Sequence, residues 1–268
     1  MQQPDNESTS QLPPPPFCGF VGRSKEISDL IESLTTFPIG FIIGEPAIGK
    51  TDLVLEYARR SESNGTYPGG VVYSQVTVGS SFQKLIHEAG TSIFGISFGD
   101  LTGEEQQEAL FKHFVENATL LIWDDINQIE SVWEDNEISK LKNHLSAWTN
   151  LTESKILLVS QTEQSIAHLT ANPEIILIPP FATSDFQKLA AAYIDIAYGD
   201  QDSKPNLSQL ENLLTNLQGN PLALQIIIPL LKSTPLGIID NELTTQLESN
   251  PDALKSSFEL YYQKGSYR

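Results

Sequence analysis

Eight consecutive residues constrain the fold of this chain more than any others. They are Gly44-Glu45-Pro46-Ala47-Ile48-Gly49-Lys50-Thr51, which match the pattern G-x-x-x-x-G-K-T. An apolar run, Ile39–Ile43, precedes the pattern, and helical periodicity follows it. A strand, a glycine-rich loop and a helix N-terminus in this order form a cradle for phosphate groups. The alternative is a glycine turn that fits the pattern by chance, and the flanking strand and helix argue against it.

The positions of this loop have distinct expected parts in nucleotide binding. Gly44 and Gly49 let the backbone turn and come close to an anion. The loop N–H groups and the positive end of the following helix then face the phosphates. Lys50 is placed to reach the β- and γ-phosphates, and the Thr51 hydroxyl to ligate Mg²⁺. The remaining residues that we expect to line the nucleotide here are Pro46, Ala47, Ile48 and Asp52.

A second motif is the apolar run Thr119–Trp123, which ends in Asp124 and Asp125. A continuous apolar run is typical of a strand buried on both faces of a parallel sheet. Ligands bind at the carboxyl ends of such strands. We therefore expect Asp124 to support Mg²⁺ through water, and Asp125 to orient or deprotonate an attacking water. Two solvated acids at a strand end are the alternative.

Composition limits the compartment and the partners. The chain has 268 residues, a net charge of −18 and a single cysteine, Cys18. Its strongly acidic surface should repel phosphodiester backbones, so we expect no direct nucleic-acid binding. One cysteine cannot form an intrachain disulfide, which suits the reducing cytoplasm. The polar N-terminal segment does not resemble a signal peptide, and no apolar run reaches the ~20 residues of a membrane span.

Strand and helix patterns divide the chain into segments. Residues 1–16, with four consecutive prolines, form a lead-in that is disordered or in polyproline II conformation. Buried strands alternate with helices over residues 17–180, which indicates an α/β domain with a parallel sheet. Residues 181–250 show only helical patterns, so we expect a small all-α domain, and residues 251–268 begin a further domain or a tail. Expected strands after the first are 70–78, 119–125, 155–161 and 174–178; expected helices include 82–94, 103–117, 137–149, 184–198, 206–217, 222–231, 241–249 and 252–262.

Two further stretches are ambiguous when each is taken alone. Phe20–Glu26 leads into an apolar face at helical spacing, so it forms either an ordinary amphipathic helix or a turn around the base end of a nucleotide. Gly219-Asn220-Pro221-Leu222 has glycine just past one helix and proline at the start of the next. Helix-capping preferences alone explain that corner.

Taken together, the motifs resemble the nucleotide-binding core of STAND-class signal ATPases of the NB-ARC type. That family includes plant resistance proteins that act in defence, apoptosome ATPases and bacterial regulators. The resemblance covers roughly residues 17–235. It rests on five stretches in the family's order, namely a linker motif at 20–26, Walker A at 44–51, Walker B at 120–125, a sensor strand at 155–161 and a G-x-P motif at 219–223.

The resemblance implies a P-loop NTPase fold with a five-stranded parallel sheet in the order 2-3-4-1-5. It also implies that Val21 and Arg23 lie beside the nucleotide, and that Pro221 with Leu222 packs on the adenine. Two departures stand out. The sensor strand ends in Gln161, where the family usually has an arginine that contacts the γ-phosphate. The winged-helix domain that normally follows the helical domain is also missing, so we expect a longer parent protein.

The resemblance implies an ATP/ADP switch with slow ATP hydrolysis, in which Lys50 and Asp125 are catalytic. ADP would hold the α/β and helical domains together, and ATP would open them and allow self-association. One alternative is a scaffold that holds ADP without turnover. A second is a conventional AAA-type (AAA+) ATPase, which would require an arginine finger and rapid turnover. The resemblance also implies an upstream activating ligand and an effector domain.

Overall fold

The computed structural model describes residues 12–77, 79–129, 133–151, 153–164, 166, 169–170 and 173–249. The expected helix at 252–262, the 251–268 segment and most of the proline-rich lead-in therefore lie outside the described residues. No helix in the described part of the chain is long and apolar enough to cross a membrane.

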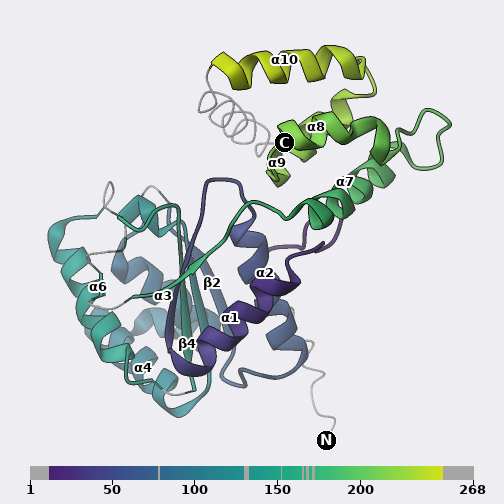
Figure 1. Ribbon diagram of the computed structural model, residues 1–268. Helices are drawn as coiled ribbons and strands as arrows, with labels where there is room; N and C mark the ends of the chain where they lie inside the picture. The colour runs from purple at the N-terminus through teal and green to yellow at the C-terminus, as the bar shows by residue number, and fades with distance from the viewer. Residues whose placement is uncertain are drawn as a thin grey trace, which may run out of the picture. The chain divides into compact units, whose positions relative to one another are not determined.

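Five strands form one parallel sheet in the order β2-β3-β4-β1-β5, which confirms the predicted topology (Figure 1). Residues at the carboxyl ends are in register, with Ile43 of β1 opposite Ser160 of β4 and Gln75 of β2 opposite Asp124 of β3. The carboxyl ends of the parallel strands therefore share one edge of the sheet. The strands are β1 (Ile39–Ile43), β2 (Val71–Gln75), β3 (Leu120–Asp124), β4 (Lys155–Ser160) and β5 (Glu174–Leu177).

Helices connect the strands, and beyond residue 180 the described chain contains helices and no strand. The helices of the α/β part are α1 (Ser24–Thr36), α2 (Lys50–Ser63), α3 (Phe82–Phe94), α4 (Gly103–Glu116) and α6 (Asp135–Trp148). Those that follow are α7 (Thr183–Tyr198), α8 (Glu211–Asn216), α9 (Pro221–Leu230) and α10 (Leu236–Ser249). Short 3₁₀ helices lie at η1 (Ile96–Asp100), η2 (Ile126–Gln128) and η3 (Leu207–Leu210).

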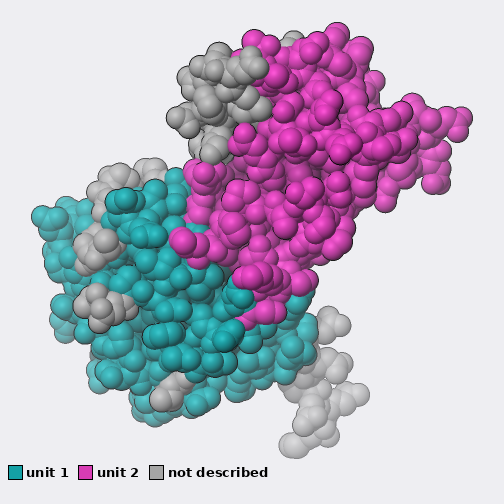
Figure 2. All heavy atoms as spheres, viewed as in Figure 1, with its two compact units in different colours: residues 1–15, 29–43, 54–176 teal, residues 16–28, 44–53, 177–268 magenta. Residues whose placement is uncertain are grey.

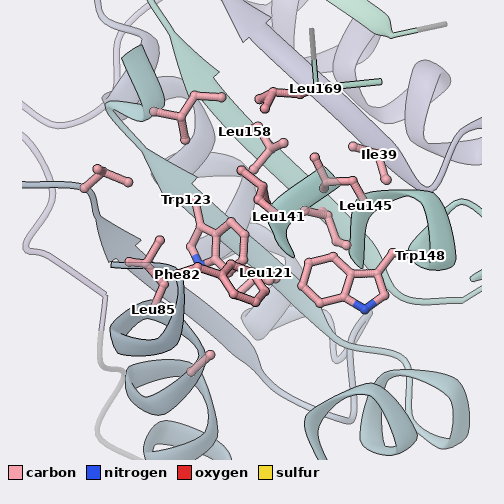
Figure 3. Close-up of a cluster of buried hydrophobic side chains, with 14 of the residues drawn as sticks. Ile39, Phe82, Leu85, Leu121, Trp123, Leu141, Leu145, Trp148, Leu158 and Leu169 are labelled. Atoms are coloured by element: carbon pink, nitrogen blue, oxygen red, sulfur yellow. The ribbon is translucent and has the colours of Figure 1, made fainter. Parts of the chain in front are cut away.

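The sheet core explains why these strands are apolar throughout. All five residues of β3 are buried, and so are all five of β1. Alternate residues of the sheet, including Leu121, Trp123 and Leu158, form one hydrophobic cluster with side chains of α3, α4 and α6 (Figure 3). The other face of the sheet carries α1 and α2 (Figure 1). A strand covered on both faces leaves no position for a polar side chain except at its ends.

Contacts divide the chain into two compact units, shown in different colours in Figure 2. The first unit holds residues 1–15, 29–43 and 54–176, and therefore the sheet with the helices packed on it. The second unit holds residues 16–28, 44–53 and 177–268. It combines the glycine-rich loop and the first turns of α1 and α2 with helices α7–α10. Its own hydrophobic cluster is built from α7, α8, α9 and α10, with Val21 and Phe181 packed against it.

Several element boundaries differ from those expected from the sequence. β2 ends at Gln75, although the apolar pattern in the sequence continues beyond it. The N–H of Val76, the next residue, still donates a hydrogen bond to Asp124 O. The helix expected at 206–217 is divided into η3 and α8. Its start is defined by Asn206, whose side chain accepts the Gln209 N–H in a capping box. α10 begins at Leu236, five residues earlier than the pattern suggested.

Candidate functional site

The glycine-rich loop that follows β1 has the backbone geometry of a tight anion-binding turn. Ala47 and Gly49 adopt positive φ angles of 58° and 93°. A Cβ atom on Gly44 would lie 2.8 Å from the Ile178 carbonyl oxygen, which is closer than real Cβ contacts, so only glycine fits there. Residues with positive φ inside a tight loop can turn backbone N–H groups towards one side, where they form a concave anion site. A cradle of this shape fits phosphate groups.

Lys50 begins α2 and folds back over the loop. Its side chain is almost completely buried, with 7% of the residue exposed. The ammonium Nζ donates to Gly44 O at 2.8 Å and to Glu45 O at 2.9 Å. A buried ammonium is costly without acceptors, so these carbonyls hold it in place. Thr51 and Asp52 follow in the first turn of the 14-residue α2, where the helix dipole favours negative groups.

Arg23 lies in the same unit and contacts the loop directly. Its Nη2 donates to Ile48 O at 3.0 Å, and its Nη1 donates to Pro179 O and to Glu26. The guanidinium also lies 3.9 Å from the centre of the Phe181 ring. Arg23 was expected to lie beside the nucleotide; in the structure its side chain binds the backbone of the loop and the segment after β5. Val21, its companion in the motif, packs against the helical cluster.

The Gly219–Leu222 corner also belongs to this unit. Gly219 has φ 72°, and a Cβ there would lie 2.7 Å from Phe181 O, so the corner requires glycine. Asn220 caps α9 by accepting the Leu222 and Ala223 N–H groups, and Pro221 opens that helix. A Cβ built on Gly49 would lie 3.8 Å from Pro221 Cγ. Pro221 therefore lies near Gly49 of the glycine-rich loop, while Leu222 is buried in α9.

The paired acids lie in the first unit, at the end of β3. Asp124 is 1% exposed; its Oδ1 accepts the Asp125 N–H at 2.8 Å and its Oδ2 accepts the Tyr73 hydroxyl at 3.0 Å. Asp125 has the left-handed φ of 57°, and its Oδ2 accepts from Gln75 Nε2 at 2.7 Å. Aspartate adopts this region more readily than most L-residues, because its short polar side chain can form local hydrogen bonds.

Gln161 follows directly after Ser160, the last residue of β4, and is half-buried. Because β4 lies between β3 and β1, Gln161 stands at the same sheet edge as Asp124 and at the strand end next to Ile43. It therefore places an uncharged amide at the carboxyl end of the sheet.

The side chains of the loop and of the strand ends are of the types that bind Mg²⁺ and nucleotides in proteins. Hydroxyl and carboxylate oxygens such as those of Thr51 and Asp124 are the ligands that Mg²⁺ takes, together with water and phosphate. Within the second unit the structure brings together Arg23, the loop, Lys50 and Pro221; Asp124, Asp125 and Gln161 belong to the first unit. Sequence reasoning missed Tyr73, Gln75 and Phe181. Polar residues at alternate positions late in an otherwise apolar strand were the available signal for the first two.

Comparison with known proteins identifies the fold through solved structures and not through sequence families. No family model matches the chain. One curated sequence, a pentatricopeptide repeat-containing protein of Arabidopsis thaliana, is 36% identical over 73 residues, which are 27% of this chain and 15% of that protein. That match is too short to show a family.

Solved structures are similar at low identity. A Walker-type ATPase of Pyrococcus abyssi has a TM-score of 0.63 at 14% identity, over 92% of this chain and 77% of that one. A STAND protein of Pyrococcus horikoshii with a tetratricopeptide repeat sensor has a TM-score of 0.59 at 17% identity, over 90% of this chain and 34% of that one. The Orc1 protein of Aeropyrum pernix, solved in complex with DNA, has a TM-score of 0.56 at 14% identity, over 79% and 59%. The chain therefore has a P-loop NTPase fold, and it spans about a third of the STAND protein.

Proposed function

We propose that this chain is the ATP/ADP-binding switch module of a STAND-type signalling ATPase, related to the NB-ARC group. The observation that carries the proposal is the proximity of Pro221, at the start of α9, to Gly49 of the glycine-rich loop within one compact unit. A helical segment that touches the phosphate loop can respond to the phosphates bound there. The similarity in fold to a STAND protein supports this function, and so does the order of the sequence motifs.

The proposed roles follow from the chemistry of each side chain. Lys50 exchanges its loop carbonyls for β- and γ-phosphate oxygens. The Thr51 hydroxyl ligates Mg²⁺, and Asp124 supports Mg²⁺ through water. When bound, Mg²⁺ neutralises charge on the phosphates. Asp125 orients the attacking water and accepts its proton. Gln161 faces the γ-phosphate with an uncharged donor, so it discriminates ATP from ADP less than an arginine would, because charge-assisted hydrogen bonds are the stronger ones.

The switch itself is proposed to work through the second unit. With ADP bound, the corner at Pro221 covers the base and holds the module closed. ATP opens it and permits self-association, and slow hydrolysis resets it. We expect this function in the cytoplasm. The proposal includes an upstream activating ligand and an effector domain, neither of which is part of the described residues.

Nucleotide binding is the first test. We expect the purified protein to carry ADP, which denaturation and chromatography would release. Mg²⁺-ADP at a hundredfold excess over Kd should stabilise the stripped protein by about 2.7 kcal/mol. Lys50→Ala should reduce this stabilisation, because it removes the positive charge of the phosphate site. A protein without nucleotide, and without a thermal shift on adding Mg²⁺-ADP, would exclude the proposal.

Turnover separates the switch from its two rivals. We expect slow phosphate release by the wild type and its loss in Asp125→Asn, which keeps the shape of the carboxylate but removes its basicity. ATP binding by that variant should persist, and light scattering should show a larger species with ATP than with ADP. No turnover at all would favour the scaffold, and rapid turnover would favour a conventional AAA-type ATPase.

A further inference from the structure

The edge strand β2 contributes a side chain to the buried acid of β3. The hydroxyl of Tyr73 donates to Asp124 Oδ2 at 3.0 Å. In the ladder, Gln75 is the direct partner of Asp124, and Tyr73 stands two residues earlier opposite Ile122. Residues two apart in a strand share one face, so the Tyr73 ring reaches diagonally along that face to the strand end.

This hydrogen bond contributes more to stabilising the buried Asp124 carboxylate than to satisfying the Tyr73 hydroxyl. Tyr73 is half-buried, and a hydroxyl at such a position can be satisfied by solvent. Asp124 is 1% exposed, and a buried carboxylate is costly unless donors reach it. Burial therefore makes the bond matter for Asp124, whichever other contacts the tyrosine has.

The two donors also define how the carboxylate is oriented. The Asp125 N–H reaches Oδ1, and the Tyr73 hydroxyl reaches Oδ2. Donors on different oxygens fix the rotation of the carboxylate plane. The Asp125 N–H belongs to the residue next to Asp124 in the chain, whereas Tyr73 is anchored in another strand.

We propose that Tyr73 is a positioning residue for Mg²⁺, which it serves by holding Asp124 in the orientation that the metal site requires. This inference rests on the proposed nucleotide-binding function. Removal of an outer-shell hydrogen-bond partner of a metal site typically lowers metal affinity or activity by about 10- to 100-fold. Tyr73 touches neither nucleotide nor metal in this role, so its effect should appear in the Mg²⁺ dependence alone.

The test is a Mg²⁺ titration of nucleotide binding by Tyr73→Phe, which removes only the hydroxyl of a half-buried residue. Nucleotide-free protein is titrated with a fluorescent N-methylanthraniloyl-ADP, once in EDTA and once across a range of Mg²⁺ concentrations. We expect the Mg²⁺ midpoint to rise roughly tenfold or more. The affinity for the nucleotide in EDTA and the thermal stability without ligand should stay close to the wild type.

Two further variants make the result specific. Tyr198→Phe removes a tyrosine hydroxyl from the hydrophobic cluster of α7–α10, and should leave the Mg²⁺ midpoint unchanged. In an Asp124→Asn background, Tyr73→Phe should add little, because the two residues act through one contact.

The outcomes distinguish this inference from the function on which it rests. If the wild type binds no nucleotide with or without Mg²⁺, both are overturned. If the wild type responds to Mg²⁺ and Tyr73→Phe has the same midpoint, only the positioning role is overturned. A Tyr73→Phe effect that also appears in EDTA, or that persists at full size in the Asp124→Asn background, equally overturns it, because Tyr73 then acts elsewhere.

Discussion

Arg23 is a buried arginine whose side chain and backbone both form hydrogen bonds to distant parts of the chain. It is 2% exposed and has the left-handed φ of 60°, with Asp185 accepting its backbone N–H at 3.1 Å. Burial lowers the pKa of its guanidinium, and the carboxylates of Glu26 and Asp185 oppose that shift. The planar fork of arginine can bind two carbonyls and lie on an aromatic ring at once, which a lysine ammonium cannot do. Arg23 is therefore placed to hold the glycine-rich loop in shape.

Arg23→Lys should lower the free energy of unfolding by about 1–3 kcal/mol, because the donors to Ile48 O and Pro179 O cannot both be replaced. Urea unfolding measures this loss, and calorimetry should show weaker ADP binding. The matched control is Arg60→Lys on α2, where the side chain is 52% exposed. There we expect a change within about 0.5 kcal/mol. Similar losses in the two variants would contradict the supporting role.

At the scale of elements, α6 caps α3. Glu137 Oε2 accepts the N–H of Phe82, the first residue of α3, at 2.8 Å, and its Oε1 accepts from Lys140. Burial alone would raise the pKa of Glu137. The hydrogen bonds from Lys140 and from the Phe82 backbone outweigh that effect, so the pKa is lower than usual. A carboxylate at a helix N-terminus satisfies donors that the helix leaves unpaired.

Glu137→Ala should cost about 1–2 kcal/mol of unfolding free energy at neutral pH. Since the folded-state pKa lies below the unfolded one, this stabilisation is present above the ordinary glutamate pKa of about 4.3. It is lost as the pH falls through the lower folded value. Denaturant melts of both proteins across that range measure the difference. Lys140→Ala should have little effect because Lys140 is 49% exposed. A Glu137→Ala cost that stays constant with pH would rule out the charged cap.

At the scale of the whole molecule, net charge is the dominant property. The net charge of the chain is −18, although structural neighbours such as the Orc1 protein of Aeropyrum pernix were solved in complex with DNA. Binding to duplex DNA depends on neutralising phosphates with lysine and arginine, of which this chain has 16 against 34 acidic residues. Similarity in fold therefore does not carry DNA binding with it.

We expect no binding of a fluorescein-labelled 30-base-pair duplex at physiological salt, with ADP or with ATP present. Fluorescence anisotropy is the measurement, at protein concentrations above the ~10⁻⁴–10⁻⁶ M that is typical of nonspecific binding. An anisotropy increase that weakens with added salt would contradict the expectation, because that dependence is the signature of phosphate contacts.

Local patterns were enough to predict the glycine-rich loop between a strand and a helix, and the buried strand that ends at Asp124. The sheet order was predicted from the resemblance to a known family, and not from local chemistry. The loop motif depends on consecutive residues, and a strand buried on both faces must be apolar along its length. The same holds for the corner at Gly219 and Pro221, where capping preferences act within a few residues. The end of β2 was predicted too late in the chain, because the hydrophobic pattern continues past the last residue of the strand.

Only the tertiary structure decided which partners the polar groups take. Arg23 reaches Pro179, 156 residues away in the chain, and Tyr73 reaches Asp124, 51 residues away. Glu137 caps a helix that begins 55 residues earlier. Pairings of this kind depend on how strands and helices are brought together, and no local pattern specifies them. The sequence by itself determined where the strands end and the glycine-rich loop lies, and the packing of distant segments decided which side chains hold the polar groups there in position.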